Sequence, residues 1–171
     1  GARLEAELAS RGVELDLLVN NAGAGLTGRF PELPLDRLLA MVDLNARAVV
    51  ELTRRFLPAM IARRHGGVIN VASTSAFQPV PFLAVYAASK SFVLSFSEAI
   101  RTELRGSGVT VTAVCPGPVR TEFTEVAGIG GVEDRTPSAV WMSAEDIAKH
   151  AVDGAVHDRR VVVPGALNRA S

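Results

Sequence analysis

Four runs rich in aliphatic and β-branched residues divide the chain, at residues 15–19, 68–72, 109–115 and 160–163. Apolar side chains follow one another within these runs instead of alternating with polar ones. Strands of a parallel sheet show this pattern because helices cover both faces of such a sheet. We therefore expect four parallel strands, each buried on both faces.

Between these runs, apolar residues recur every three or four positions, which is typical of helices that bury one face. The helices predicted in this way cover residues 2–11, 35–64, 84–105 and 143–156. Gly12 should end the first helix, Ser143 should cap the last, and Pro58 should bend the second. The apolar face predicted for the second helix comprises Leu35, Leu38, Leu39, Val42, Val49, Leu52, Phe56, Leu57 and Met60.

Strands that alternate with helices in this way predict an α/β fold. We expect a doubly wound parallel sheet with helices on both faces. In such sheets, ligands bind outside the carboxyl ends of the strands. The residues that follow the predicted strands are chemically unusual there: Asn-Asn-Ala-Gly at 20–23, Ser73, and Pro-Gly at 116–117. The sequence therefore places its candidate site at this edge of the sheet.

Tyr86 and Lys90 stand four residues apart at the start of the predicted helix 84–105. Residues at this spacing share one face of a helix, so the ammonium group should lie beside the phenol. A neighbouring cation lowers the pKa of a phenol, which suits it to act as a general acid or base. Taken alone, the pair fits an ordinary helix with one tyrosine and one lysine equally well.

Two other features allow both a structural and a functional interpretation. The small residues at 20–23 suit close approach by a ligand, although a plain turn also explains them. Asn45 interrupts an apolar helix, where asparagine is neither a good helix former nor cheap to bury. A solvent-exposed side chain is the simpler explanation for Asn45.

Composition argues against several classes of protein. The 18 Lys and Arg residues balance 18 Asp and Glu residues, so no net charge favours nucleic acid or an anionic membrane. The single cysteine, Cys115, cannot form an internal disulfide, which fits a reducing compartment. No apolar run approaches the roughly 20 residues that cross a bilayer, and the start lacks the apolar core of a signal peptide. We expect a cytoplasmic protein with no metal, nucleic-acid or membrane partner.

Together these features resemble the short-chain dehydrogenase/reductase family, of the classical type. The matching motifs are residues 20–23, Asn45, Ser73, Tyr-Ala-Ala-Ser-Lys at 86–90 and Pro-Gly-Pro-Val-Arg-Thr at 116–121. Ser73 precedes Tyr86 by thirteen residues, which is the usual spacing in the family. The resemblance implies that residues 1–171 form a single, partial Rossmann-like domain. It also implies hydride transfer between a nicotinamide cofactor and a carbonyl or alcohol.

The resemblance implies a role for each matching residue. Tyr86 exchanges a proton with the substrate oxygen, and Ser73 orients that oxygen. Lys90 lowers the pKa of Tyr86 and holds the nicotinamide ribose. Asn45 distorts its helix and positions a water in the proton relay. The residues implied to bind the cofactor are Asn21, Ala22, Gly23, Asn45, Tyr86, Lys90, Pro116, Gly117, Val119 and Thr121.

The sequence departs from the family at its start. The family opens with a strand, a glycine-rich turn that binds pyrophosphate, and a helix, and no such turn precedes residue 15. At roughly 30 residues per βαβ unit, about 60 residues would be missing. Either the 171 residues belong to a longer enzyme, or the chain is short and has lost cofactor binding. The 171-residue chain alone should bind NADPH poorly, and micromolar binding would contradict this.

We expect NADP(H) or NAD(H) as the cofactor, with NADP slightly preferred, and a small or medium apolar carbonyl or alcohol as the substrate. The loop at 123–142 should cover an apolar pocket through Val126, Ile129, Val140, Trp141 and Met142. Simple packing explains Trp141 as well. The alternatives are a non-catalytic cofactor sensor or scaffold, an inactive fragment, and an epimerase or dehydratase of the related extended branch.

The two long predicted helices, 35–64 and 84–105, form the dimer face in the family, so the resemblance implies a homo-oligomer. Val49, Phe56, Val93 and Ile100 would fill either that interface or the core of the protein. The sequence alone does not separate these two possibilities.

Overall fold

The computed structural model describes residues 1–121, 123, 127–128, 138–165 and 168. The expected pocket residues Val126 and Ile129 lie outside this part of the chain. Two short 3-10 helices lie outside the main layers, η1 (Phe30–Glu32) and η4 (Ser138–Val140). No helix of the described part is both long and apolar enough to cross a membrane.

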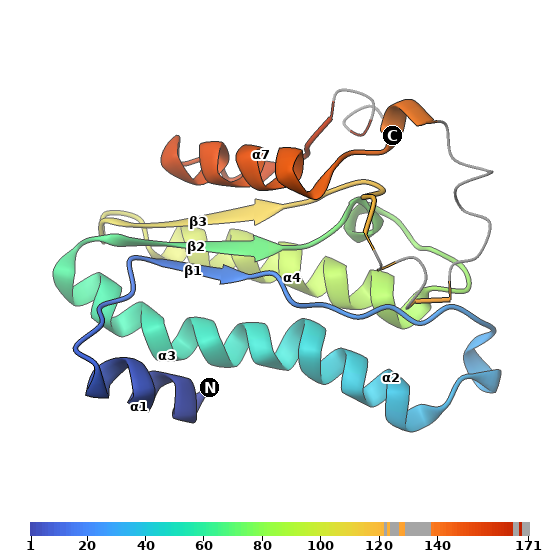
Figure 1. The fold of residues 1–171 in the computed structure, drawn as a ribbon, viewed down its shortest axis with the longest axis horizontal. Helices are drawn as coiled ribbons and strands as arrows, with labels where there is room; N and C mark the ends of the chain where they lie inside the picture. The colour runs from blue at the N-terminus through green and yellow to red at the C-terminus, as the bar shows by residue number, and fades with distance from the viewer. Residues whose placement is uncertain (122, 124–126, 129–137, 166–167, 169–171) are drawn as a thin grey trace.

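Four parallel strands form the central sheet, in the order β1-β2-β3-β4. They are β1 (Leu17–Asn20), β2 (Gly66–Val71), β3 (Val109–Val114) and β4 (Val161–Val162). Their carboxyl ends point to the same edge of the sheet (Figure 1). The predicted α/β class and parallel sheet are confirmed.

Helices cover the sheet on both of its faces (Figure 1). On one face, α3 (Ala48–Arg63) and α4 (Ala84–Glu103) pack on a core that includes Leu18, Val68 and Val111. On the other, α7 (Ala144–Val156) packs on the core around Ile69, Val114 and Val162. The Ser143 hydroxyl caps α7 by accepting a hydrogen bond from the Asp146 backbone N–H, as the sequence predicts. The first helix, α1 (Ala2–Ser10), has no buried residue.

The prediction that the first strand is buried on both faces is wrong. Leu18 and Asn20 are buried, whereas Leu17 is 40% exposed and Val19 is 50% exposed. Leu17 and Val19 lie on the same face of the sheet as α7. That helix contacts β2, β3 and β4, whereas β1 lies at the opposite edge of the sheet from β4. The strand also begins at Leu17 and not at residue 15.

The predicted helix 35–64 divides into three parts. They are α2 (Leu35–Val42), the π-helical turn η2 (Asp43–Arg47) and α3. The predicted apolar face is only partly buried, because Leu35 is 68% exposed and Leu39 is 57% exposed. Both residues lie on α2, which extends past the carboxyl ends of the strands, where no sheet covers it (Figure 1).

The four apolar residues that the sequence assigns to either the dimer interface or the core all lie in the core. Val49 and Val93 are buried in one core cluster. Phe56 is buried in another, and Ile100 packs against that second cluster. They therefore belong to the core. The exposed apolar residues on these helices are different ones, among them Leu39, Val50 and Phe92.

The turn before β3, at residues 106–108, contains two glycines that differ in the space around them. Gly106 and Gly108 both have left-handed backbones, with φ of 80° and 82°. A Cβ at Gly108 would strike the backbone oxygen of Arg64, whereas one at Gly106 would meet nothing within 4 Å. We expect Gly108→Ala to destabilise the protein by about 3 kcal/mol, and Gly106→Ala by about 1 kcal/mol. Urea unfolding of the two variants measures this, and equal losses would contradict it.

Candidate active site

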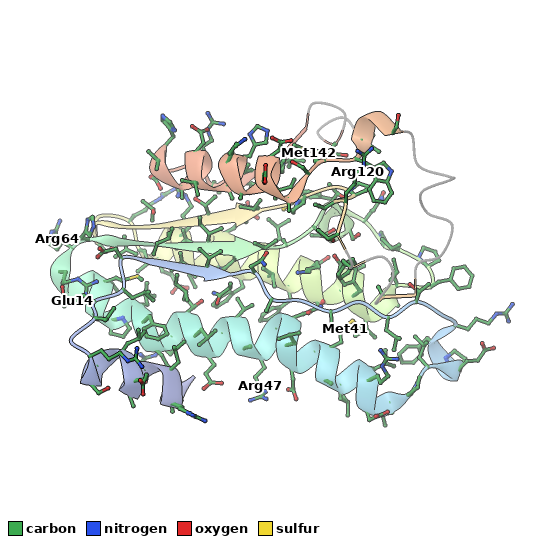
Figure 2. The ribbon with its side chains drawn as sticks, in the orientation of Figure 1. Glu14, Met41, Arg47, Arg64, Arg120 and Met142 are labelled. Atoms are coloured by element: carbon green, nitrogen blue, oxygen red, sulfur yellow. The ribbon has the colours of Figure 1, made fainter. Side chains whose placement is uncertain are left out.

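Three loops meet beyond the carboxyl ends of β1, β2 and β3. The loop after β3 is held to its neighbours by backbone hydrogen bonds. Thr74 N donates to Pro116 O at 2.9 Å, and Met142 N donates to Pro118 O at 3.1 Å. Figure 2 shows Arg120 and Met142 at this edge, whereas Glu14 and Arg64 lie at the opposite end of the sheet.

Tyr86 and Ser73 meet at this edge of the sheet. Tyr86 lies in the first turn of α4 and is 9% exposed. Ser73 follows β2 and caps η3 (Thr74–Phe77), its hydroxyl accepting a hydrogen bond from Ser75 N at 3.1 Å. Burial raises the pKa of Tyr86, and a hydrogen bond with the Ser73 hydroxyl partly offsets this rise. Ser73 therefore acts on the Tyr86 phenol within a poorly solvated part of the protein.

Lys90 lies one helical turn after Tyr86 and is 5% exposed. Its ammonium group donates a hydrogen bond to Val71 O at 2.9 Å and lies 5.8 Å from the centre of the Tyr86 ring. Burial lowers the pKa of Lys90 to about 8. The buried Lys90 side chain is thus held at the end of β2, between Tyr86 and the strand that leads to Ser73.

The expectation that Lys90 lowers the pKa of Tyr86 is wrong for this structure. The pKa of Tyr86 is raised, burial is the largest cause, and the opposing contribution comes from Ser73. The physical reason is that the same burial acts on both side chains. It disfavours the phenolate of Tyr86 and the ammonium of Lys90 alike, and the ammonium is directed at Val71 O.

Asn45 joins the loop after β1 to α4. It is 1% exposed, so the simpler interpretation of a solvent-exposed asparagine is wrong. Its Oδ1 accepts from Ala24 N at 2.9 Å, and its Nδ2 donates to Ala24 O at 2.9 Å and to Ser89 Oγ at 3.0 Å. The helix around it is distorted into η2, as the resemblance implies. The role of Asn45 in positioning a water stays a prediction.

These bonds give Asn45 a measurable structural effect. Asn45→Ala should destabilise the protein by about 2–4 kcal/mol, because the N–H and C=O groups of Ala24 would both lose their partner. Urea unfolding measures the change. A loss below about 1 kcal/mol would show that Ala24 finds other partners.

The residues expected to bind a cofactor lie along the same edge. Asn21, Ala22 and Gly23 are exposed. A Cβ at Gly23 would lie 3.1 Å from Lys90 Nζ and 3.4 Å from Asn45 Oδ1, so the backbone of Gly23 packs directly against these two buried groups.

The loop after β3 carries the other expected cofactor residues. Val119 pairs with Met142 in an isolated parallel bridge. Thr121 is exposed, and its hydroxyl accepts a hydrogen bond from Phe123 N at 3.3 Å. Pro116 is buried and Gly117 is half-buried beside it.

Two residues at the site, Ser89 and Phe123, were not identified from the sequence. Ser89 donates a hydrogen bond to Tyr86 O at 2.7 Å and accepts one from Asn45. Its position inside the Tyr-Ala-Ala-Ser-Lys motif could have identified Ser89 as a residue of the site. The ring of Phe123 lies 5.4 Å from the ring of Tyr86, and a Cβ at Gly25 would come within 2.8 Å of it. This contact depends on the path of a loop, which leaves no periodic signal.

The side chains can supply a proton and orient an oxygen, but they cannot supply or accept hydride. The described residues contain no group of three His, Cys, Asp or Glu side chains that could hold a metal ion. Hydride transfer at this edge would need a bound cofactor, with the protein providing orientation and electrostatics. The exposed loop at 21–23, which has no side chain at Gly23 between it and Lys90, fits the approach of such a group.

Comparisons with known proteins agree with this arrangement. The family described as short chain dehydrogenase matches residues 3–128. The NADP-dependent 3-hydroxy acid dehydrogenase YdfG of Escherichia coli K12 is 39% identical over 157 residues, covering 86% of this chain and 63% of that protein. The chain thus spans less than two thirds of the length of that relative.

Two solved structures have the same fold. A structure from Beutenbergia cavernae with bound NADP is 31% identical, with a TM-score of 0.86, over 99% of this chain and 72% of that one. A short-chain dehydrogenase from Sphingobium yanoikuyae in complex with NADPH is 28% identical, with a TM-score of 0.85, over 96% of this chain and 63% of that one. From its sequence, its parallel sheet and the residues gathered at the carboxyl edge, the chain belongs to the short-chain dehydrogenase/reductase family.

Proposed function

We propose that the protein containing this chain is an oxidoreductase that transfers hydride between NAD(P)(H) and a carbonyl or alcohol. The observation that carries the proposal is the buried Tyr86 side chain, whose pKa Ser73 lowers and whose ring lies 5.8 Å from the Lys90 ammonium group. Tyr86, Ser73, Lys90 and Asn45 are the proposed catalytic residues.

Tyr86 has the role of proton donor and acceptor. Because burial raises its pKa, the phenol is protonated at neutral pH and can donate to a carbonyl oxygen as that oxygen gains negative charge. In the reverse direction, the phenolate takes the proton of the alcohol. Ser73 would donate a hydrogen bond to the same substrate oxygen and so hold it beside Tyr86.

A nicotinamide cofactor supplies or accepts the hydride when it is bound. Lys90 would hold its ribose, and the exposed residues 21–23 would line its adenosine side. Pro116, Gly117, Val119 and Thr121 would hold its nicotinamide end. We favour NADP(H) over NAD(H), because the Escherichia coli relative is NADP-dependent and the two solved structures hold NADP or NADPH.

The substrate is proposed to be apolar next to its carbonyl carbon. Tyr86 packs in a cluster with Leu38, Met41 and Phe123. The half-buried Phe123, which packs on the Tyr86 ring, would contact a substrate whose carbonyl reaches Tyr86. Trp141 is half-buried farther along the loop, which fits packing as well as substrate contact.

A homo-oligomer is proposed through the two long helices. Leu39 on α2, Val50 on α3 and Phe92 on α4 are 57%, 37% and 43% exposed. Burying such residues against a second copy would remove apolar surface from water. Sedimentation of the full-length protein measures the assembly.

The proposed activity is tested with the full-length protein, NADPH and a panel of apolar ketones. Turnover of at least one ketone, with cofactor oxidation matching product formation, is expected. Tight nucleotide binding without turnover of any ketone would overturn the proposal. That result would favour the alternative of a non-catalytic cofactor sensor.

A further inference from the structure

Four buried polar side chains cross the core between the sheet and the helices α3 and α4. Asn20 Nδ2 donates to Asn70 Oδ1 at 2.8 Å and to Thr53 Oγ1 at 3.2 Å. Asn70 Nδ2 donates to Ser97 Oγ at 2.9 Å, and Ser97 Oγ donates to Val93 O at 2.6 Å. We call Asn20, Thr53, Asn70 and Ser97 the amide ladder. Asn20 is 7% exposed, and the other three are at most 1% exposed.

The amide ladder connects the segments that carry the candidate site, without belonging to the site itself. Asn20 and Asn70 are partners in the parallel pairing of β1 with β2. Asn70 precedes Ser73 by three residues along β2. Ser97 follows Lys90 by seven residues, which is about two turns of α4, so both side chains lie on the same face of that helix.

Hydrogen bonds fix a position that apolar contacts leave free. Around the ladder, α4 packs on β2 and β3 through aliphatic side chains. Burial of apolar surface is non-directional, so such contacts resist separation of the helix from the sheet more than a slide along it. The bond between Asn70 and Ser97 restricts that slide, because hydrogen bonds weaken when their geometry departs from a narrow range.

Stability alone does not explain polar residues at these places. Buried amides cost free energy unless every polar atom is paired. Asn20 Oδ1 is buried and has no hydrogen-bond partner in the part of the chain that the structure describes. Aliphatic side chains of similar size would avoid this cost. Departures of this kind are expected where a sequence serves function.

We propose that Asn70 and Ser97 are positioning residues, whose hydrogen bond fixes α4 along β2 and thereby sets the distance between Tyr86 and Ser73. The inference rests on the proposed function for its catalytic meaning. Lys90 makes the second polar contact between the same two elements, through Val71 O. Two contacts about two turns apart fix both the position and the rotation of the helix.

The test compares Ser97→Ala with two controls in the full-length protein. Ser95→Ala removes an exposed hydroxyl from the same helix. Ile100→Val weakens the packing of α4 outside the ladder. The first readout is the pKa of Tyr86. It is measured by NMR titration of protein labelled with carbon-13 at tyrosine, and the Tyr86→Phe variant identifies the signal of Tyr86. This readout needs no turnover. The second readout is kcat with the best ketone of the panel.

Ser97→Ala should raise the pKa of Tyr86, because a looser Ser73 contact lowers it less, and should reduce kcat about tenfold. Both controls should leave the pKa unchanged. Should Ser97→Ala fail to fold, Ser97→Cys keeps the side-chain volume and should give a smaller shift in the same direction. An unchanged pKa of Tyr86 in the folded variant would overturn the inference. Absence of turnover in the wild type would overturn the proposed function alone, since the NMR result still decides on the ladder.

Discussion

Tyr86→Phe in the full-length protein should lower kcat by about two to four orders of magnitude while leaving the fold intact. The substitution removes only the hydroxyl group that is proposed to exchange a proton with the substrate. The ring remains and keeps its packing against Leu38, Met41 and Phe123. Losing the interaction of the phenol with Ser73 should cost at most about 1 kcal/mol of stability. Steady-state kinetics and urea unfolding measure the two effects separately.

Cofactor affinity provides the internal check for this variant. NADPH should bind Tyr86→Phe within a few fold of its wild-type affinity, because the phenol is not the main holder of the cofactor. Ser95→Ala serves as a control for removing a hydroxyl group from α4. If Tyr86→Phe kept more than a tenth of the wild-type kcat, the proposed proton donor would have to be another group.

Lys90→Met should lower kcat by at least about two orders of magnitude. It should also remove the contribution that titration of Lys90 makes to the free energy of unfolding. Burial lowers the pKa of Lys90 from 10.5 to about 8. Between these two values, the unfolded chain binds the proton and the folded chain does not. The wild type should therefore become more stable, relative to Lys90→Met, as the pH rises from about 8 to about 10.5.

The size of this effect follows from the lowered pKa. A decrease from 10.5 to about 8 corresponds to about 3 kcal/mol. Urea unfolding of both proteins at a series of pH values gives the difference in stability. Taking the difference cancels most of the titration of other groups, except that of the buried Cys115 thiol, whose pKa Lys90 lowers. A difference that stays flat, or that falls with pH, would show that Lys90 is better solvated than its burial indicates.

Much of the site followed from the spacing of residues in the sequence. The carboxyl ends of parallel strands lie at one edge of the sheet. The sequence alone therefore predicts that residues 20–23, Ser73 and Pro116 lie close together. The spacing of four residues put Tyr86 and Lys90 on one face of α4. These inferences held because they depend only on the periodicity of strands and helices.

The rest depended on information that periodicity does not carry. Leu17 and Val19 looked like buried residues of a strand, but whether a face is covered depends on where distant helices pack. Asn45 looked like a misplaced polar residue because its partner Ala24 lies 21 positions away and presents only backbone atoms. The pKa values of Tyr86 and Lys90 could not be read from their spacing, since desolvation is the largest cause of both shifts.

The transfer of deuterium tests the central claim most directly. The full-length protein would be supplied with a ketone of the panel and with NADPH that carries deuterium at its transferable position. The alcohol formed should carry one deuterium on its carbinol carbon, and Tyr86→Phe with bound cofactor should form almost none of this product. An alcohol product free of deuterium, or transfer by Tyr86→Phe at the wild-type rate, would contradict hydride transfer assisted by Tyr86.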